Sequence, residues 1–303
     1  MSVITIGSYN VEHDGWTSDG RGGGHLDKWY AAHEELGKIP FDILFRQEMT
    51  HSRENGKRLL FEAERMLAMR GFLAPSETKE SPNPPGIFIR PDTFRVIGEW
   101  PQENDWWHAP CAIQVKFAEH STPIHRASVH LGSRAPERRQ IEARSITTWN
   151  RRNLAVIMGG DFNSYSNSGI ELQAFPSWPD LLDRGHQEHR TRGGVETDTE
   201  PDRILTAVGL DDVAVHAARH LGQLDALAPT ASLHPEITRR QGPRQRIDQQ
   251  RVSRALLPAL RSFTVVPLPF SDHALTYSVW DSDELLAGLE RHPTFDYRHS
   301  TPV

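Results

Sequence analysis

The chain has 303 residues, and 37% of them are hydrophobic, which is enough for a substantial core in one large domain or two small ones. Its 34 basic and 40 acidic side chains give a formal net charge of -6. This balance argues against tight non-specific binding of long nucleic acid, although bound metal ions could offset it locally. The single cysteine, Cys111, excludes a disulfide within the chain. Because there is no leader-like segment and no apolar run of bilayer length, we expect a cytoplasmic protein with no membrane association.

Short apolar runs rich in β-branched residues alternate with stretches of helical spacing along the whole chain. The predicted strands are residues 3–8, 41–45, 86–89, 112–117, 127–131, 154–158, 246–252 and 274–280. The predicted helices are residues 56–70, 136–150, 212–221 and 282–292. Residues 14–24, 76–85, 101–110 and 164–200 are rich in Gly, Pro, Ser, Asn or Trp and are predicted to be loops. This interleaving, without a low-complexity linker or an internal repeat, predicts one α/β domain of layered sheets and helices.

Nearly every predicted strand ends in, or lies next to, polar residues that suit metal, phosphate or proton chemistry. In chain order they lie in the segments SYNVE, ILFRQE, SVHL, IMGGDFNS, RQRID and PFSDHAL, and they are Asn10, Glu12, Glu48, His130, Asp161, Asn163, Asp248, Asp272 and His273. The two glycines of IMGGDFNS are expected to let the backbone turn sharply. Each fragment alone could be an ordinary turn, because Asn, Asp and Gly are common turn residues. Their joint order is much harder to obtain by accident.

That joint order resembles the endonuclease/exonuclease/phosphatase superfamily, whose fold is also called DNase I-like. The resemblance runs from about residue 4 to residue 280, and GGDFNS, RID and SDH are its strongest motifs. It implies an α/β four-layered sandwich with two packed central β-sheets flanked by helices. It also implies hydrolysis of phosphodiesters or phosphomonoesters with Mg²⁺ or Mn²⁺. On this basis residues 1–280 are predicted to form the catalytic domain, and residues 281–303 a C-terminal helix and peripheral tail.

The resemblance also implies a role for each matching residue. Glu48 corresponds to the principal metal ligand, and Asn10, Glu12 and Asp272 lie on the metal side. Asp161 and Asn163 correspond to the pair that orients the attacking water and the scissile phosphate. His130 corresponds to a phosphate-binding histidine, and Asp248 and His273 to a hydrogen-bonded pair.

The chemistry of phosphate esters explains why these residue types are needed. Anionic ester oxygens repel a nucleophile, so cations and neutral donors must face them. Mg²⁺ prefers oxygen ligands and keeps several waters, so one or two carboxylates such as Glu48 and Asp272 are sufficient to hold it. A carboxylate behind an imidazole, here Asp248 behind His273, fixes the tautomer of the ring. Whether Asp161 or His273 removes the proton from water is left open by the sequence.

Two positions depart from the family pattern, and both could shape the substrate pocket. Arg46 stands where an apolar residue is more usual, and Gln249 follows Asp248 where many members carry an aromatic residue. Arg46 could instead point into solvent at the strand end.

Other basic and aromatic residues are candidates for contact with the substrate. They are Arg134, beyond His130, Arg246, in the run RRQGPRQR that also contains Arg239 and Arg240, and Trp107, which could stack on a base. Each has a purely structural alternative: most charge runs are solvated, and tryptophan is a common packing residue. His186 and His189 are expected to be surface imidazoles, because no second ligand pair accompanies them.

Three functions are compatible with these residues. The first is a phosphodiesterase acting on a nucleic acid or nucleotide, and the second is a phosphatase or phosphodiesterase for sugar, inositol or lipid-headgroup phosphates. The third is a binding module that has kept the fold and lost catalysis, which the intact residue set disfavours. No obligate protein partner is indicated. Endo or exo action, the number of metal ions and the oligomeric state are left open.

Overall fold

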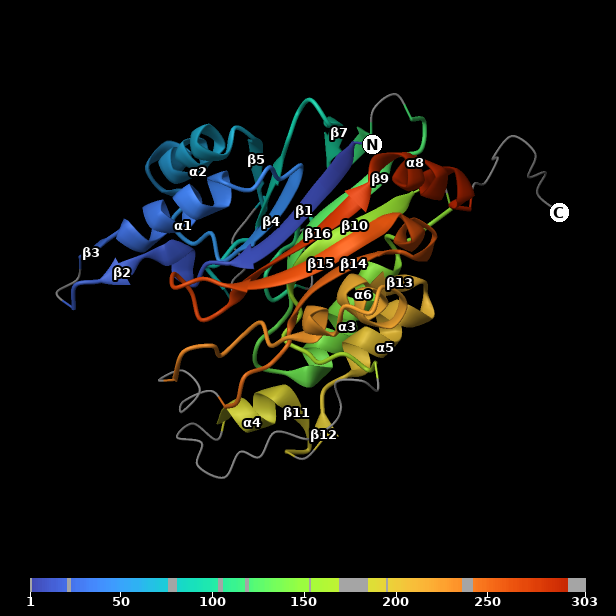
Figure 1. The fold of residues 1–303 in the computed structure, drawn as a ribbon. Coiled ribbons are helices and arrows are strands. Elements are labelled where there is room, and N and C mark those ends of the chain that lie inside the picture. The colour runs from blue at the N-terminus through green and yellow to red at the C-terminus, as the bar shows by residue number, and fades with distance from the viewer. Residues whose placement is uncertain are drawn as a thin grey trace.

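The computed structural model describes residues 2–20, 23–75, 81–102, 106–117, 120–152, 154–168, 185–194, 196–235 and 242–293. Two six-stranded β-sheets pack face to face at its centre, with helices on both outer sides (Figure 1). The predicted four-layered α/β sandwich is therefore confirmed. Within the described ranges, no helix combines the length and the apolar character that a membrane crossing requires.

The first sheet has the strand order β15-β16-β1-β4-β6-β5. Its strands are β1 (Val3–Asn10), β4 (Ile43–Gln47), β5 (Arg70–Leu73), β6 (Gly86–Ile89), β15 (Leu260–Pro267) and β16 (Ala274–Asp281). The central pair, β1 and β4, is parallel, and the other pairs are antiparallel. Asn10 lies opposite Gln47 at the carboxyl end of that parallel pair.

The second sheet repeats this plan with the strand order β13-β14-β10-β9-β8-β7. Its strands are β7 (Phe94–Glu99), β8 (Cys111–Phe117), β9 (Ile124–His130), β10 (Ala155–Asp161), β13 (Leu210–Asp212) and β14 (Asp248–Ser253). Its parallel pair is β9 and β10, and Asp161 lies opposite both His130 on β9 and Asp248 on β14. In each sheet, the central parallel pair of strands thus ends in polar residues.

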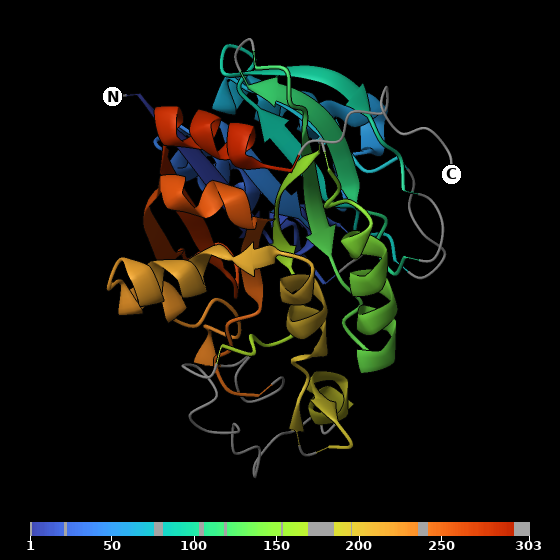
Figure 2. The same cartoon turned by 90° about the vertical axis from the view of Figure 1, so that its right-hand side faces the viewer.

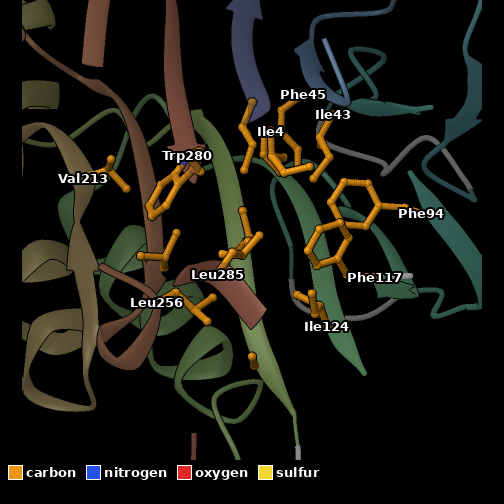
Figure 3. Close-up of a cluster of buried hydrophobic side chains, with 14 of the residues drawn as sticks. Ile4, Ile43, Phe45, Phe94, Phe117, Ile124, Val213, Leu256, Trp280 and Leu285 are labelled. Atoms are coloured by element: carbon orange, nitrogen blue, oxygen red, sulfur yellow. The ribbon is translucent and has the colours of Figure 1, made fainter. Parts of the chain in front are cut away.

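The main core lies between the two sheets (Figure 3). Ile43 and Phe45 of the first sheet meet Phe94, Phe117 and Ile124 of the second sheet. Fully buried aromatic and aliphatic side chains of this kind stabilise a domain by about 1.5–3 kcal/mol each relative to exposure. The buried Cys111 is part of this core, as expected for a strand thiol, and burial raises its pKa.

The two glycines of IMGGDFNS serve the packing of the sheets, and the prediction that they form a sharp turn is wrong. Both lie inside β10. A Cβ atom at Gly159 would lie 2.5 Å from Cδ2 of Phe45 on the opposite sheet, and one at Gly160 would lie 1.8 Å from the carbonyl oxygen of Val129. A side chain at Gly159 would force the two sheets apart, and one at Gly160 would force β10 away from its neighbouring strand β9.

Helices cover the outer faces of the sandwich. Residues of α1 (Asp27–Gly37) and α2 (Glu54–Leu67) pack on the outer face of the first sheet. Residues of α3 (Pro136–Thr147) and α5 (Glu200–Ala207) pack on the second sheet and lie side by side (Figure 2). Two further helices, α6 (Val213–His220) and α8 (Ser282–Arg291), add residues to the main core. Asp212 and Asp281 begin these two helices by accepting hydrogen bonds from backbone N–H groups of the first turn.

Each predicted strand and helix has a counterpart, and in every case except the strand 86–89 at least one end differs from the prediction. The unpredicted main elements are α1, α5, β5, β7, β13 and β15. The remaining short elements are η1 (His13–Gly15), β2 (Thr17–Ser18), β3 (Gly24–His25), α4 (Gly185–Arg190), β11 (Thr191–Arg192), β12 (Glu196–Thr197), η2 (Leu224–Leu227) and η3 (Arg254–Ala259). The proposed domain boundary after residue 280 precedes α8, whose Leu285 and Leu289 are fully buried in the main core. That division remains a prediction.

Candidate active site

A pocket of about 640 Å³ opens where the carboxyl ends of the two parallel strand pairs meet. Most of the site residues predicted from the sequence line it: Glu12, Glu48, Trp107, His130, Arg134, Asp161, Asn163, Asp272 and His273. Ligands of layered α/β proteins commonly bind at the carboxyl ends of strands, because loops of several strands converge there.

The first sheet contributes the acidic side of the pocket. Asn10 ends β1, and its Nδ2 donates to Glu48 Oε1 at 3.3 Å and to Asp161 Oδ2 at 3.4 Å. Glu48 directly follows β4 with a left-handed φ of 56°, a backbone conformation that non-glycine residues rarely adopt. Its Oε2 accepts a hydrogen bond from the backbone N–H of His13 at 2.8 Å. Burial, together with the carboxylates of Asp272 and Glu48, raises the pKa of Glu12. Several carboxylates therefore face one another here.

This acidic side suits a hard cation. Its donors are carboxylate and amide oxygens, and Asn10 Oδ1 is buried with no hydrogen-bond partner among the described residues. A second group, Asp161, Asp248 and His273, also brings ligand atoms within 4.8 Å of one another. We favour the Glu48 side for Mg²⁺ or Mn²⁺, because His273 Nδ1 is already engaged by Asp248 and Mg²⁺ prefers oxygen.

His130 and Asp161 end the parallel pair of the second sheet. His130 Nε2 lies 3.5 Å from Asp161 Oδ2, and its ring stacks on that of His108 with centroids 4.0 Å apart. Burial lowers the pKa of His130 to about 4, so the ring is neutral near pH 7. Burial alone would raise the pKa of Asp161, but His130, His273 and Arg190 outweigh it and lower the pKa. Asp161 is therefore ionised near neutral pH.

His273 and Asp248 form the hydrogen-bonded pair that the resemblance implied. His273 Nδ1 lies 2.8 Å from Asp248 Oδ2, so Nε2 is the ring atom left to face Asp161 Oδ2 and Asp272 Oδ1, each at 3.9 Å. Burial alone would lower the pKa of His273, but the carboxylates of Asp248 and Asp272 outweigh it and hold the pKa well above its ordinary value. A protonated imidazole can thus donate into the pocket.

Two predicted substrate contacts line the rim. The guanidinium of Arg134 lies over the ring of Trp107, with Cζ 5.5 Å from the ring centroid. The neighbouring Trp106 is buried and packs near Trp149, so it has a structural role. The pair Arg134 and Trp107 is therefore the candidate rim contact for a substrate.

Two other predicted contacts lie outside the pocket, and these predictions are wrong. Arg46 is fully buried, donates to His33 at 2.7 Å and pairs with Asp14 at 3.5 Å, so it neither shapes the pocket nor points into solvent. Arg246 is buried and pairs with Asp212 at 2.7 Å. Both guanidiniums are taken out of water, and a buried acidic partner is what makes such burial tolerable.

The second family departure, Gln249, also lies outside the pocket lining. It is fully buried, and its Nε2 donates to Ser164 O. Arg239 and Arg240 lie outside the described residues.

Several residues that line the pocket were not predicted from the sequence. His13, Asn83, His108 and Arg190 line the pocket, and so do His186 and His189, which were interpreted as surface imidazoles. His108 directly follows Trp106 and Trp107 in the sequence, and this cluster of aromatic residues is the one sequence feature that could have indicated it. Arg190 lies within the predicted loop 164–200 and carried no signal, because its role depends on tertiary contacts.

No family model matches the chain, and neither does any curated protein sequence. Solved structures do match its fold. An endonuclease/exonuclease/phosphatase family protein from Bacteroides thetaiotaomicron is 16% identical with a TM-score of 0.57, and the match covers 97% of this chain and 99% of that one. TDP2 from D. rerio, complexed with a single-strand DNA product, is 15% identical with a TM-score of 0.58, covering 93% and 100%. A mannosyl-6-phosphatase from B. thetaiotaomicron is 15% identical with a TM-score of 0.57, covering 91% and 98%. The chain therefore has the DNase I-like fold that the motifs predicted.

Proposed function

We propose that this protein is a divalent-metal-dependent phosphoesterase that hydrolyses a phosphodiester in a nucleic acid or nucleotide. The observation that carries the proposal is the convergence of Glu48, His130, Asp161 and His273 in one pocket from strands far apart in the sequence. Acidic groups on one side and imidazoles on the other are what a bound cation and a phosphate anion would each require.

Mg²⁺ or Mn²⁺ would be held by Glu48, with Asn10, Glu12 and Asp272 beside it. When bound there, the ion would polarise a phosphate oxygen and stabilise charge on the leaving oxygen. The backbone N–H of His13 orients the Glu48 carboxylate, because it holds Oε2 at 2.8 Å.

The remaining residues would act on the phosphate and the attacking water. His130 and Asn163 line the pocket and would bind phosphate oxygens, and His273 would donate from Nε2 because Asp248 occupies Nδ1. The lowered pKa of Asp161 and the raised pKa of His273 favour Asp161 as the group that takes the proton from water. The sequence had left this choice open.

A nucleic-acid or nucleotide substrate is supported by the fold shared with TDP2 bound to a DNA product, and by the cationic and aromatic rim of Arg134 and Trp107. A small-molecule phosphatase or phosphodiesterase is the second candidate. The net charge of -6 favours it, as does the fold shared with a mannosyl-6-phosphatase. A cytoplasmic location and action without a membrane or obligate protein partner remain predictions from the sequence.

The test is a screen of turnover with Mg²⁺, with Mn²⁺ and with EDTA. Substrates would be supercoiled plasmid, single-stranded oligonucleotides, nucleotides and sugar phosphates. We expect turnover that EDTA abolishes, and the substrate that responds decides between the two candidates. Glu48→Gln and His273→Gln should each remove it, while Glu35→Gln on the exposed face of α1 should not. Full activity in both site variants would contradict the proposal, and binding of an ester without turnover would favour a non-catalytic module.

A further inference from the structure

Asn163 lines the pocket, and hydrogen bonds engage both its backbone and its side-chain amide. It is 1% exposed and has a left-handed φ of 50°. Its backbone N–H donates to Asp161 Oδ1 at 2.9 Å, and its Nδ2 donates to Leu131 O at 2.8 Å. Nδ2 carries two hydrogens, and the bond to Leu131 O uses one of them. The direction of that second hydrogen depends on how firmly the amide is fixed.

Arg190 supplies the donor for the other end of this amide. It is the last residue of α4, is 8% exposed and lines the pocket. Its Nη1 donates both to Asn163 Oδ1 and, at 3.2 Å, to Asn163 O. A guanidinium can only donate and a backbone carbonyl can only accept, so Arg190 and Leu131 O impose the same orientation on the amide. Without Arg190, the buried Oδ1 would lose its partner and the side chain could rotate.

A second buried arginine fixes the segment that carries Arg190. Arg139 of α3 is fully buried and donates to His189 O at 2.7 Å, to Asp198 Oδ2 at 2.8 Å and to Gly132 O at 2.9 Å. Arg139 thus ties the backbone next to Arg190 to α3 and to the loop after β9.

Asp198 in turn connects this segment to the loop after β10, which carries Asn163. Its backbone N–H donates to Arg190 O at 3.1 Å, and its carbonyl accepts from the N–H of Tyr165 at 2.9 Å. The segment around α4, which lies below α3 in Figure 1, is thus tied to the loops that follow β9 and β10.

We propose that Arg190 is a positioning residue of the phosphoesterase: it acts through Asn163, by holding the amide whose free Nδ2 hydrogen meets the scissile phosphate. The inference rests on the proposed function. Arg190 also places a positive charge beside the pocket, so the alternative to exclude is direct binding of the phosphate by its guanidinium. The two roles differ in how the effect of removing Arg190 depends on Asn163.

A double-mutant cycle separates these roles. Arg190→Met keeps the length and packing of the side chain and removes its donors, and Asn163→Ala removes the amide. We expect Arg190→Met to lower kcat by about tenfold or more while KM changes by less than about threefold. In the Asn163→Ala background the same change should lower kcat by no more than about twofold further, because its target is already absent. Multiplication of the two single effects, or a raised KM at unchanged kcat, would overturn the proposal.

Two further variants provide the controls. Arg192→Met removes an exposed arginine two residues along, which pairs with Glu196, and should leave kcat and KM unchanged. Arg190→Lys keeps a charged donor on a shorter side chain, so it should recover only part of kcat. If Arg190→Met does not fold, as judged by circular dichroism, Arg190→Lys carries the cycle in its place.

One readout does not depend on turnover. In ¹H–¹⁵N spectra the side-chain amide of Asn163, assigned by its absence in Asn163→Ala, should shift in Arg190→Met and stay in place in Arg192→Met. An unshifted amide in Arg190→Met would overturn the positioning role. If the amide signal shifts in Arg190→Met as expected but the parent protein turns over no phosphate ester, the result would instead overturn the proposed function.

Discussion

Replacing Arg46 by methionine should destabilise the protein strongly, although Arg46 does not line the pocket proposed to bind the substrate. The side chain lies on β4 and is fully buried, two residues before Glu48. Its Nη2 pairs with Asp14 at 3.5 Å, and its Nη1 lies 2.7 Å from His33 Nε2. His33 Nδ1 must donate to Trp29 O, at 2.8 Å, so Nε2 is the acceptor and the ring is neutral. Burial lowers the pKa of His33, which agrees with that assignment.

The size of the expected loss in stability follows from the buried Asp14 carboxylate, which the methionine would leave without its ion-pair partner. Methionine fills much of the space of the arginine, so the loss is mainly electrostatic. Asp14 is fully buried, and without Arg46 it would keep only neutral side-chain donors, among them Ser52 Oγ at 2.8 Å and the side chain of Trp29. Breaking a buried ion pair by removing one member costs about 3–5 kcal/mol, because the other charge stays buried. We therefore expect the free energy of unfolding to fall by about that amount.

The assay is equilibrium unfolding in urea at pH 7.5, with two variants for comparison. Adding Asp14→Asn to Arg46→Met removes the orphaned charge and should recover at least about 1 kcal/mol, since asparagine tolerates the left-handed φ of 58° at this position. Arg65→Met removes an exposed arginine that pairs with Glu62 on α2 and should leave the midpoint unchanged. A loss below about 1 kcal/mol in Arg46→Met, or no recovery in the double variant, would refute the reasoning.

Three further predictions test the site, the core and the response to pH. Glu48→Gln should weaken Mg²⁺ binding by about 100-fold or more, measured by isothermal titration calorimetry, whereas Glu35→Gln should not change it. Gly160→Ala should lower the free energy of unfolding by at least about 3 kcal/mol in urea titrations, because its Cβ would lie 1.8 Å from Val129 O. Burial lowers the pKa of His125 to about 4, so the unfolded chain binds a proton near pH 6.5 that the folded chain does not. Stability should therefore fall between about pH 6.5 and pH 4, by up to about 3 kcal/mol from this residue, and His125→Phe should reduce that slope; an unchanged slope would contradict the assignment.

Most strands and helices of the fold could be predicted from local sequence patterns. The strand 86–89 is predicted with its observed bounds, and the helix predicted over 136–150 begins at the observed residue, Pro136, a residue type favoured at the first helical position. β7 was missed because five of its six residues are not buried, which leaves little apolar pattern in an edge strand. α1 could have been found, since Trp29, Ala32, His33 and Leu36 repeat at helical spacing, but the buried His33 obscured its apolar face.

Site residues could be predicted from the sequence where the backbone fixes their position, and could not be predicted where only side-chain packing does. Asn10, Glu48, His130 and Asp161 end or directly follow the two parallel strand pairs, so the topology alone brings them together. Arginines have no such constraint, because a long side chain can reach a pocket or fold back to a buried acid from the same backbone position.

Arg46 and Arg190 illustrate this in opposite directions. Arg46 lies two residues from Glu48 in sequence, yet its guanidinium turns to Asp14 and stabilises the loop after β1. Arg190 lies far from every motif, yet it reaches Asn163 because Arg139 and Asp198 hold its backbone in place. A buried guanidinium needs fixed partners on several sides, so its neighbours are set by the finished fold and not by the segment that carries it. The arrangement of arginines around the pocket is thus the part of the site in which two proteins with the same strand-end residues can differ most.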